Sequence, residues 1–396
     1  MADESLNNRR ERRQIARRRS AGTGVYTSVH EVEHRDSERR EHRRGASGRA
    51  QQVSRGFAAR LLRWFDVHGR HDLPWQHPRN AYRLWLAEVM LQQTQVATVI
   101  PYFLRFVEKY PKLQALAATP LDDVLALWSG LGYYSRARNL RHAAQICVER
   151  HRGALPRDFD ALAALPGIGR STAGAILAQA HGLRFAILDG NVKRVLARQH
   201  GVRGWPGNAA VQRKLWELAE AHTPRERVSD YTQAIMDLGA TVCTRAKPRC
   251  TTCPLERSCV AHREGTVAQL PERKPTRALP TRRTIMLLLR DRAGRILLER
   301  RPPTGVWAQL WSLPEADDAD SARRRLGANL ALHALPPFVH TFSHYRLAVE
   351  ILHARFDRTP RIAAAPDCRW LLPQEAAALG LPAPVRRLIA SIEENP

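Results

Sequence analysis

The sequence lacks the features of a membrane-spanning protein and of a secreted, disulfide-rich one. No apolar run approaches the roughly 18 residues that a membrane-spanning helix needs. Only six of the 396 residues are cysteines, and four of these cluster between positions 243 and 259, unlike the framework of a secreted mini-protein. We therefore expect no membrane association and a reducing cytoplasm.

Acidic residues are scarce relative to basic ones. Lys and Arg total 63 against 38 Asp and Glu, so the formal net charge is +25. An excess of this size favours a polyanionic partner, and without a membrane segment nucleic acid is the favoured one. The length is sufficient for two or three domains, each with its own core.

Apolar periodicity is nearly missing from the first 54 residues. This region is rich in Arg, Glu, Ser and His and cannot bury enough apolar surface to fold. Organelle transit peptides are also rich in Arg but poor in acidic residues, whereas positions 31–41 alone contain five. We predict a disordered basic tail over residues 1–54.

A glycine-rich turn at Leu165–Ala173 is the clearest local motif. Gly167 and Gly169 let the backbone approach a bulky partner and adopt dihedral angles that other residues avoid. Apolar residues recur at 173, 176, 177 and 180 before Gly182, which predicts that a helix completes a helix-hairpin-helix. Free amides at its start form an anion site suited to a DNA phosphate, although the motif alone also fits an ordinary helix turn.

Residues 81–100 are apolar on nearly all sides and predict a buried helix that ends at Pro101. Three polar exceptions fall on one face at i, i+4 and i+7: Glu88, Gln92 and Gln95. Because buried unpaired polar groups are costly, we expect this face to border a cleft. The alternative is a structural glutamate paired with Arg83 or Arg105.

A second isolated carboxylate, Asp189, precedes a predicted helix that Asn191 caps and that ends at Gln199. The helix start is expected to keep this carboxylate ionised. Other helices are expected over 102–110, 120–128, 136–151 and 158–164. Among them, Tyr133 and Tyr134 follow a glycine loop and are either packing aromatics or an exposed surface for base stacking.

The clustered cysteines are Cys243, Cys250, Cys253 and Cys259. Four thiolates suit either Zn²⁺ or an iron–sulfur cluster, and their spacing does not decide between the two.

The apolar period changes after a Pro- and Lys-containing linker predicted over 263–281. Apolar runs at 285–289 and 296–298 flank a hairpin signature, and residues 345–351 alternate between apolar and polar or small. With a final helix near 384–393, these elements predict a separate domain of strands and helices over 282–396.

Together these residues resemble the MutY family of adenine-specific mismatch DNA glycosylases, within the helix-hairpin-helix superfamily. The resemblance covers about residues 56–390 and depends on the order of its motifs: Leu-Pro-Trp (73–75), residues 85–96, residues 130–140, the hairpin, residues 188–194, the four-cysteine loop and Phe-Ser-His (342–344).

This resemblance implies a multidomain fold. An all-α helix-hairpin-helix glycosylase core would occupy 55–262, with a six-helix barrel at about 79–190 and a second lobe carrying an iron–sulfur loop at 243–259. An α+β Nudix domain similar to MutT would follow, without the Arg-Glu-x-x-Glu-Glu helix that binds Mg²⁺ in Nudix hydrolases. The implied cofactor is a [4Fe-4S] cluster held by the four cysteines.

The implied activity is base excision repair. The enzyme would flip out and remove adenine mispaired with 8-oxoguanine or guanine in double-stranded DNA, leaving an abasic site. We expect a monomer associated with the nucleoid. The alternatives are a bifunctional glycosylase and lyase for oxidised pyrimidines, similar to endonuclease III, and a non-catalytic iron–sulfur DNA-binding protein.

The resemblance also assigns the catalytic roles. Glu88 would protonate N7 of adenine and later activate water, because burial on an apolar helix raises its pKa. Asp189 would stabilise or trap the positively charged sugar, as carboxylates do in glycoside hydrolysis. Asn191 would orient one of these carboxylates.

Contacts to DNA are assigned in the same way. Gln92 and Tyr133 would form a wedge beside the lesion, and Trp75 and Gln233 would line the adenine pocket. The hairpin would hold a phosphate through the amides of residues 167–170, among them Gly167, Gly169 and Arg170.

Two departures from related families restrict the expected activity. Ser171 stands where strand-cleaving relatives carry a nucleophilic lysine, so we predict base removal without strand cleavage. The C-terminal domain lacks the Mg²⁺-binding helix of Nudix hydrolases, so we expect it to recognise a base without hydrolysing a nucleotide. The resemblance assigns 8-oxoguanine recognition there to Phe342, Ser343 and His344.

Overall fold

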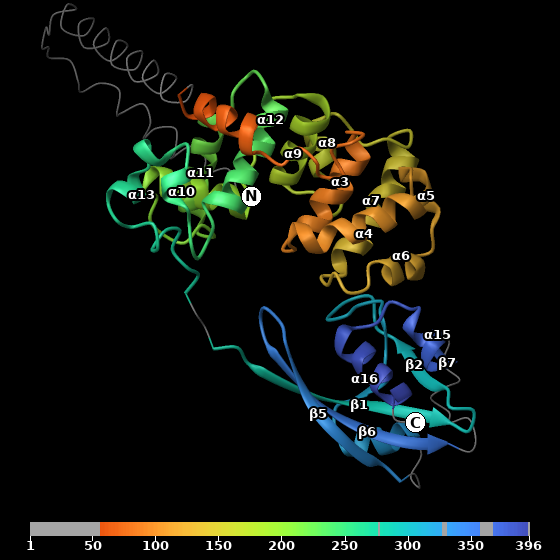
Figure 1. Cartoon of the computed structure of the whole chain (residues 1–396). Helices are drawn as coiled ribbons and strands as arrows, with labels where there is room; N and C mark the ends of the chain where they lie inside the picture. The colour runs from red at the N-terminus through yellow and green to blue at the C-terminus, as the bar shows by residue number, and fades with distance from the viewer. Residues whose placement is uncertain (1–55, 276–277, 327–330, 357–366, 395–396) are drawn as a thin grey trace, which may run out of the picture. The chain divides into compact units, whose positions relative to one another are not determined.

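The computed structural model describes residues 56–275, 278–326, 331–356 and 367–394, and the tail predicted over 1–54 lies outside this part of the chain (Figure 1). None of the described helices is long and apolar enough to cross a membrane.

The first half of the described chain is helical. A helix over residues 56–68 precedes the labelled helices of the first lobe: α3 (Ala81–Leu91), α4 (Val96–Lys109), α5 (Leu113–Ala118), α6 (Leu121–Leu127), α7 (Ser135–Arg150), α8 (Phe159–Ala163) and α9 (Arg170–His181). The second lobe follows with α10 (Gly190–His200), α11 (Ala209–His222), α12 (Val228–Asp237), a π-helical turn η2 (Leu238–Val242), the short turns η3 (Cys250–Thr252) and η4 (Glu256–Ser258), and α13 (Val260–Arg263).

The single helix predicted over 81–100 is wrong, because the chain forms α3 and α4 with a break at residues 92–95. Gln93 has a φ of +59°, which no α-helix accommodates. The break leaves main-chain carbonyls at the end of α3 without helical donors. The buried guanidinium of Arg136 replaces these donors and donates to the carbonyls of Val89, Met90 and Gln92. Pro101 lies inside α4, where it removes one helical hydrogen bond without ending the helix.

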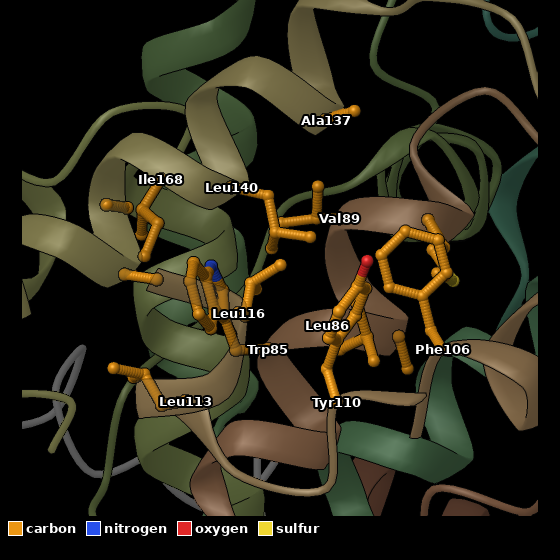
Figure 2. Packing of buried hydrophobic residues seen from close by; sticks show 14 of the residues in the cluster. Trp85, Leu86, Val89, Phe106, Tyr110, Leu113, Leu116, Ala137, Leu140 and Ile168 are labelled. Atoms are coloured by element: carbon orange, nitrogen blue, oxygen red, sulfur yellow. The ribbon is translucent and has the colours of Figure 1, made fainter. Parts of the chain in front are cut away.

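Two hydrophobic clusters correspond to the two lobes. In the first, α3 is buried on most sides as expected, and Trp85, Leu86 and Val89 pack with residues of α4, α5 and α7 (Figure 2). In the second, Phe57 and Leu61 of the helix over 56–68 pack with residues of α10, α11 and α12. The chain passes from the first lobe to the second through residues 182–189, which places Asp189 at the junction.

The C-terminal domain is a mixed sheet covered by helices. Its elements are β1 (Thr281–Asp291), β2 (Ile296–Arg300), β3 (Trp311–Ser312), β4 (Glu315–Ala316), α14 (Ala319–Leu326), β5 (His333–Thr341), β6 (Arg346–Phe356), β7 (Cys368–Leu371), α15 (Pro373–Ala377) and α16 (Ala383–Glu394). The main strand order is β3-β2-β1-β6-β5, with β1 parallel to β6.

Successive side chains of β1 point to opposite faces of this sheet and contribute to the hydrophobic core on each face. Met286 and Leu288 pack with residues of α15 and α16 on one face, and Leu287 and Leu289 pack with residues of α14 on the other. The strands predicted around 285–289, 296–298 and 345–351 and the helix near 384–393 are confirmed.

The segment predicted as a linker over 263–281 is partly packed. Leu270 is buried, and its carbonyl accepts a hydrogen bond of 2.8 Å from Arg198. Strand β1 begins at Thr281, within the predicted linker.

Candidate active site

The predicted hairpin forms between α8 and α9. Gly167 has a φ of +80°, and a Cβ there would lie 3.0 Å from Cβ of Asn139, so both its dihedral angle and its surroundings favour glycine. Gly169 has an extended conformation that any residue adopts, so the expectation of unusual dihedral angles is wrong at this position. It caps α9 without a side-chain hydrogen bond, which leaves the first amides of that helix available to an anion.

A cavity of about 890 Å³ lies at the junction of the two lobes. Its wall contains seven of the residues expected to act in the site: Trp75, Glu88, Gln92, Ser171, Asp189, Asn191 and Gln233. These residues come from five separate segments of the chain, from the loop before α3 to α12. The fold therefore brings together side chains that are up to 158 positions apart, from 75 to 233.

Glu88 projects from α3 into this cavity. Its carboxylate accepts one long hydrogen bond, of 3.4 Å, from Nε2 of Gln179. Burial, and to a lesser extent the nearby charge of Asp189, raises the pKa of Glu88 to about 7. A carboxyl group with this pKa exists in both protonation states near neutral pH and can donate or accept a proton.

The alternative of a structural ion pair is not observed for Glu88. Arg83 donates instead to main-chain carbonyls, including that of Pro74 at 2.6 Å. The guanidinium of Arg105 lies over the ring of Tyr102, 4.5 Å from its centroid.

Asp189 is the N-cap of α10, and the prediction that Asn191 caps this helix is wrong. The Oδ1 atom of Asp189 accepts a hydrogen bond of 2.8 Å from the amide of Val192. Asn191 is the second residue of the helix, and its Nδ2 atom donates to Oδ2 of Asp189 at 3.2 Å. Capping therefore fixes one carboxylate oxygen and Asn191 contacts the other, in agreement with an orienting role for Asn191.

The charge of Asp189 depends on more than the helix start. The pKa of Asp189 is raised above its usual value, because burial outweighs the amide of Val192 and the charge of Arg194, which lower it; contrary to our expectation, the helix start alone does not keep this pKa low. Arg194 also donates to Oδ1 of Asn191 at 2.7 Å and to the carbonyl of Cys243 at 2.7 Å. This arginine thus orients the Asn191 amide so that its NH₂ group faces Asp189.

Gln233 is also held in one orientation. Its Nε2 atom donates to Oδ1 of Asp237 at 2.7 Å, and Asp237 is in turn bound by Arg70 at 2.6 Å. The amide oxygen of Gln233 therefore remains as a hydrogen-bond acceptor in the cavity wall, suited to an amino group. Trp75 contributes a buried ring that packs edge-on against Phe103.

A smaller cavity of about 210 Å³ lies beside the hairpin. Gln92 and Gly167 line it, and Nε2 of Gln92 donates to the carbonyl of Gly167 at 3.4 Å. Tyr133 lies on its rim with half of its surface exposed and a φ of +47°. The structure therefore brings the two expected wedge residues to the same cavity.

Ser171 and Arg170 have contacts that the sequence did not reveal. The hydroxyl of Ser171 accepts a hydrogen bond of 2.9 Å from the amide of Leu188, which ties α9 to the residue before Asp189. The side chain of Arg170 pairs with Glu220 and stacks on Trp216, so only its main chain faces the hairpin.

The four clustered cysteines line one pocket of the second lobe. None forms a disulfide, and Arg198 reaches Sγ of Cys243 at 3.4 Å. Within the described ranges, no three His, Cys, Asp or Glu side chains lie close enough to hold a metal ion. A [4Fe-4S] cluster differs from a single ion in that each of its four thiolates binds a different iron.

In the C-terminal domain, Phe342, Ser343 and His344 form the turn between β5 and β6. Phe342 packs against the rings of His340 and Tyr345, 4.5 and 4.9 Å away between centroids. Ser343 and His344 are exposed, with Oγ of Ser343 3.4 Å from Nδ1 of His344. The turn therefore presents two hydrogen-bonding side chains next to a fixed aromatic ring.

Comparison with known proteins matches both domains. Residues 86–221 match the family described as HhH-GPD superfamily base excision DNA repair protein, and residues 285–391 match the NUDIX domain. The predicted fold class, a helical helix-hairpin-helix domain followed by a Nudix domain, is confirmed.

Individual relatives extend over most of the chain. The adenine DNA glycosylase of Buchnera aphidicola (Acyrthosiphon pisum) is 34% identical over 86% of this chain and 98% of that protein. The human adenine DNA glycosylase is 35% identical over 81% of this chain and 70% of that protein. A solved thermostable thymine-DNA glycosylase is 27% identical, with a TM-score of 0.48, over 55% of this chain and 99% of that one.

Proposed function

The chain belongs to the adenine DNA glycosylase family, and we propose that it removes adenine mispaired with 8-oxoguanine or guanine from double-stranded DNA. The observation that carries this proposal is the cavity in which Glu88, with a pKa raised to about 7, faces the same space as Asp189. A proton donor beside a second carboxylate is the arrangement that glycosidic bond cleavage requires.

The reaction divides between the two carboxyl groups. Adenine leaves readily only after protonation, and Glu88 donates that proton to N7. Departure of the base leaves positive charge on the sugar, which Asp189 stabilises as a carboxylate. Glu88, now ionised, then takes a proton from the water that attacks the sugar.

Recognition of the flipped base follows from the orientation of Gln233. Because Asp237 accepts its NH₂ group, its carbonyl oxygen faces the cavity and accepts a hydrogen bond from the amino group of adenine. Gln92 and Tyr133 fill the space that the base leaves, and the first amides of α9 hold a phosphate.

Base removal without strand cleavage is supported by Ser171. A serine hydroxyl cannot form the Schiff base through which a lysine cleaves the strand. Its hydroxyl is moreover used as an acceptor for the Leu188 amide. This observation disfavours the bifunctional alternative.

We propose that Cys243, Cys250, Cys253 and Cys259 hold a [4Fe-4S] cluster. Support comes from the four unpaired thiols around one pocket and from the guanidinium of Arg198, which would offset the negative charge of thiolates. When bound, the cluster would brace the loop whose Cys243 carbonyl contacts Arg194.

The turn at 342–344 is proposed to read 8-oxoguanine, with Ser343 donating to the altered edge of the base. Replacing both Ser343 and His344 by alanine is expected to lower the preference for 8-oxoguanine over guanine by about three- to tenfold, since one or two hydrogen bonds are lost. The measurement is the ratio of single-turnover rates on the two duplexes. His333→Ala, at the far end of β5, is the control, and an unchanged ratio in the double variant would contradict this role.

The substrate assignment is tested with adenine opposite 8-oxoguanine, guanine or thymine. We expect rapid adenine release from the first duplex, slower release from the second and little from the third, with intact strands until alkali is added. Robust strand cleavage by the purified protein would support the bifunctional alternative. We further propose that the protein acts as a monomer on nucleoid DNA in the cytoplasm; the net charge of +25 supports the binding to DNA.

A further inference from the structure

Arg136 is a buried arginine with an unusual set of partners. It lies at the start of α7, and only 7% of its surface is exposed. In the described residues no carboxylate pairs with its guanidinium. Since a buried charge without compensation is costly, its hydrogen bonds have to supply that compensation.

These hydrogen bonds reach two separate segments. Nη1 donates to three carbonyls at the end of α3: Val89 at 3.0 Å, Met90 at 2.7 Å and Gln92 at 2.6 Å. Nη2 donates to Oγ1 of Thr94 and to the carbonyls of Leu131 and Gly132, each at 3.2 Å. Arg136 thus links residues 89–94 to residues 129–134, and among the described residues no hydrogen bond joins these two segments directly.

The two segments carry the two wedge residues. Gln92 is bound through its own carbonyl, and Tyr133 follows Gly132 directly, with its ring centroid 5.5 Å from the guanidinium carbon. Both segments leave regular structure here, since Gln93 and Tyr133 have positive φ angles. Such backbone conformations persist only where the surroundings fix them.

We propose that Arg136 is a positioning residue that fixes the spacing of Gln92 and Tyr133, and that this spacing drives extrusion of the target base. This inference rests on the proposed function, because it assumes that the two residues enter the duplex. A planar guanidinium reaches carbonyls on both segments at once, whereas a lysine ammonium is a compact charge with three donors. Arg136→Lys therefore keeps the charge but loses the connection.

The test compares two substrates for the full-length protein. In one duplex the adenine lies opposite 8-oxoguanine, and in the other the same adenine lies in a one-nucleotide bulge, where extrusion costs less. Arg136→Lys is expected to be at least about tenfold slower on the paired adenine and within about threefold of the unmodified protein on the bulged one, as expected from the loss of charge-assisted bonds. With 2-aminopurine in place of the paired adenine, the fluorescence that reports an extruded base should be lower for Arg136→Lys than for the unmodified protein.

The matched control is Arg141→Lys, on the same helix. Arg141 also donates to a main-chain carbonyl, that of Thr119, but contacts neither wedge segment. It should leave both rates and the fluorescence unchanged. Thr94→Val, which removes a single bond to Arg136, should give the same pattern with a smaller loss and is informative even if Arg136→Lys does not fold.

The outcomes separate this inference from the proposed function. If the unmodified protein releases adenine from neither duplex, the proposed function fails and the inference fails with it. If the unmodified protein acts on both duplexes and Arg136→Lys lowers the rate of adenine release by the same factor on each, only the inference is overturned. The double variant Arg136→Lys with Tyr133→Ala gives another test. If its total loss in rate equals the product of the two single losses, the two residues act independently and the inference is also overturned.

Discussion

Glu88→Gln is expected to lower the single-turnover rate of adenine release by about 10²–10⁴-fold, the usual contribution of a general acid. Glutamine has nearly the same shape as glutamate and can keep the contact with Gln179, but it has no proton to donate. Duplex binding should be largely retained, because the phosphate contacts that we propose come from the hairpin rather than from Glu88.

The pH dependence of the unmodified protein gives a second measure of the same group. The pKa of Glu88 is raised to about 7, and only the protonated form donates to adenine. The single-turnover rate should therefore fall by about tenfold for each pH unit above 7, and it should also fall at low pH, where Asp189 becomes protonated and loses its charge. Glu88→Gln should abolish the fall above pH 7.

The control is Glu108→Gln, an exposed glutamate on α4 with no place in the cavity wall. It should leave the rate and its pH profile unchanged. An unchanged rate in Glu88→Gln would contradict the acid role. Duplex binding without adenine release by the unmodified protein would instead favour the alternative of a non-catalytic DNA-binding protein.

Local sequence patterns predicted the elements whose apolar periodicity is complete within their own residues. The helix α9, with its periodic apolar residues and Gly182 as a left-handed C-cap, follows from its own sequence, and so do β1, β2 and β6. The break between α3 and α4 could not be predicted in this way. It depends on Arg136, 44 positions beyond Gln92 in the sequence, which satisfies carbonyls that a continuous helix would have used.

The same distinction applies to the site. Glu88 and Asp189 are visible because carboxylates are conspicuous in apolar surroundings. Arg194 and Asp237 were missed, because a Lys-Arg pair and a helical Asp look like ordinary surface residues in the sequence. Their role depends on partners brought close by the fold, Asn191 with Cys243 for one and Gln233 with Arg70 for the other.

Asp189→Asn is expected to reduce adenine release by about 10²–10³-fold, the scale of losing one preorganised electrostatic contact in a transition state. The variant removes the negative charge that faces the developing positive charge on the sugar. It should hardly affect folding, because Asn is as favourable as Asp at a helix N-cap and can still accept the hydrogen bond from Val192. The measurements are the single-turnover rate and the thermal unfolding midpoint.

Two further variants separate the charge from the cap. Asp189→Ala removes both and should lower the unfolding free energy by about 1 kcal/mol as well as the rate. Asp158→Asn is the matched control, since Asp158 caps α8 through a 2.9 Å bond to the amide of Ala161 and lies outside the cavity wall. Full activity in Asp189→Asn would mean that the capping geometry alone matters. Loss of activity with unchanged stability would instead assign the effect to the charge.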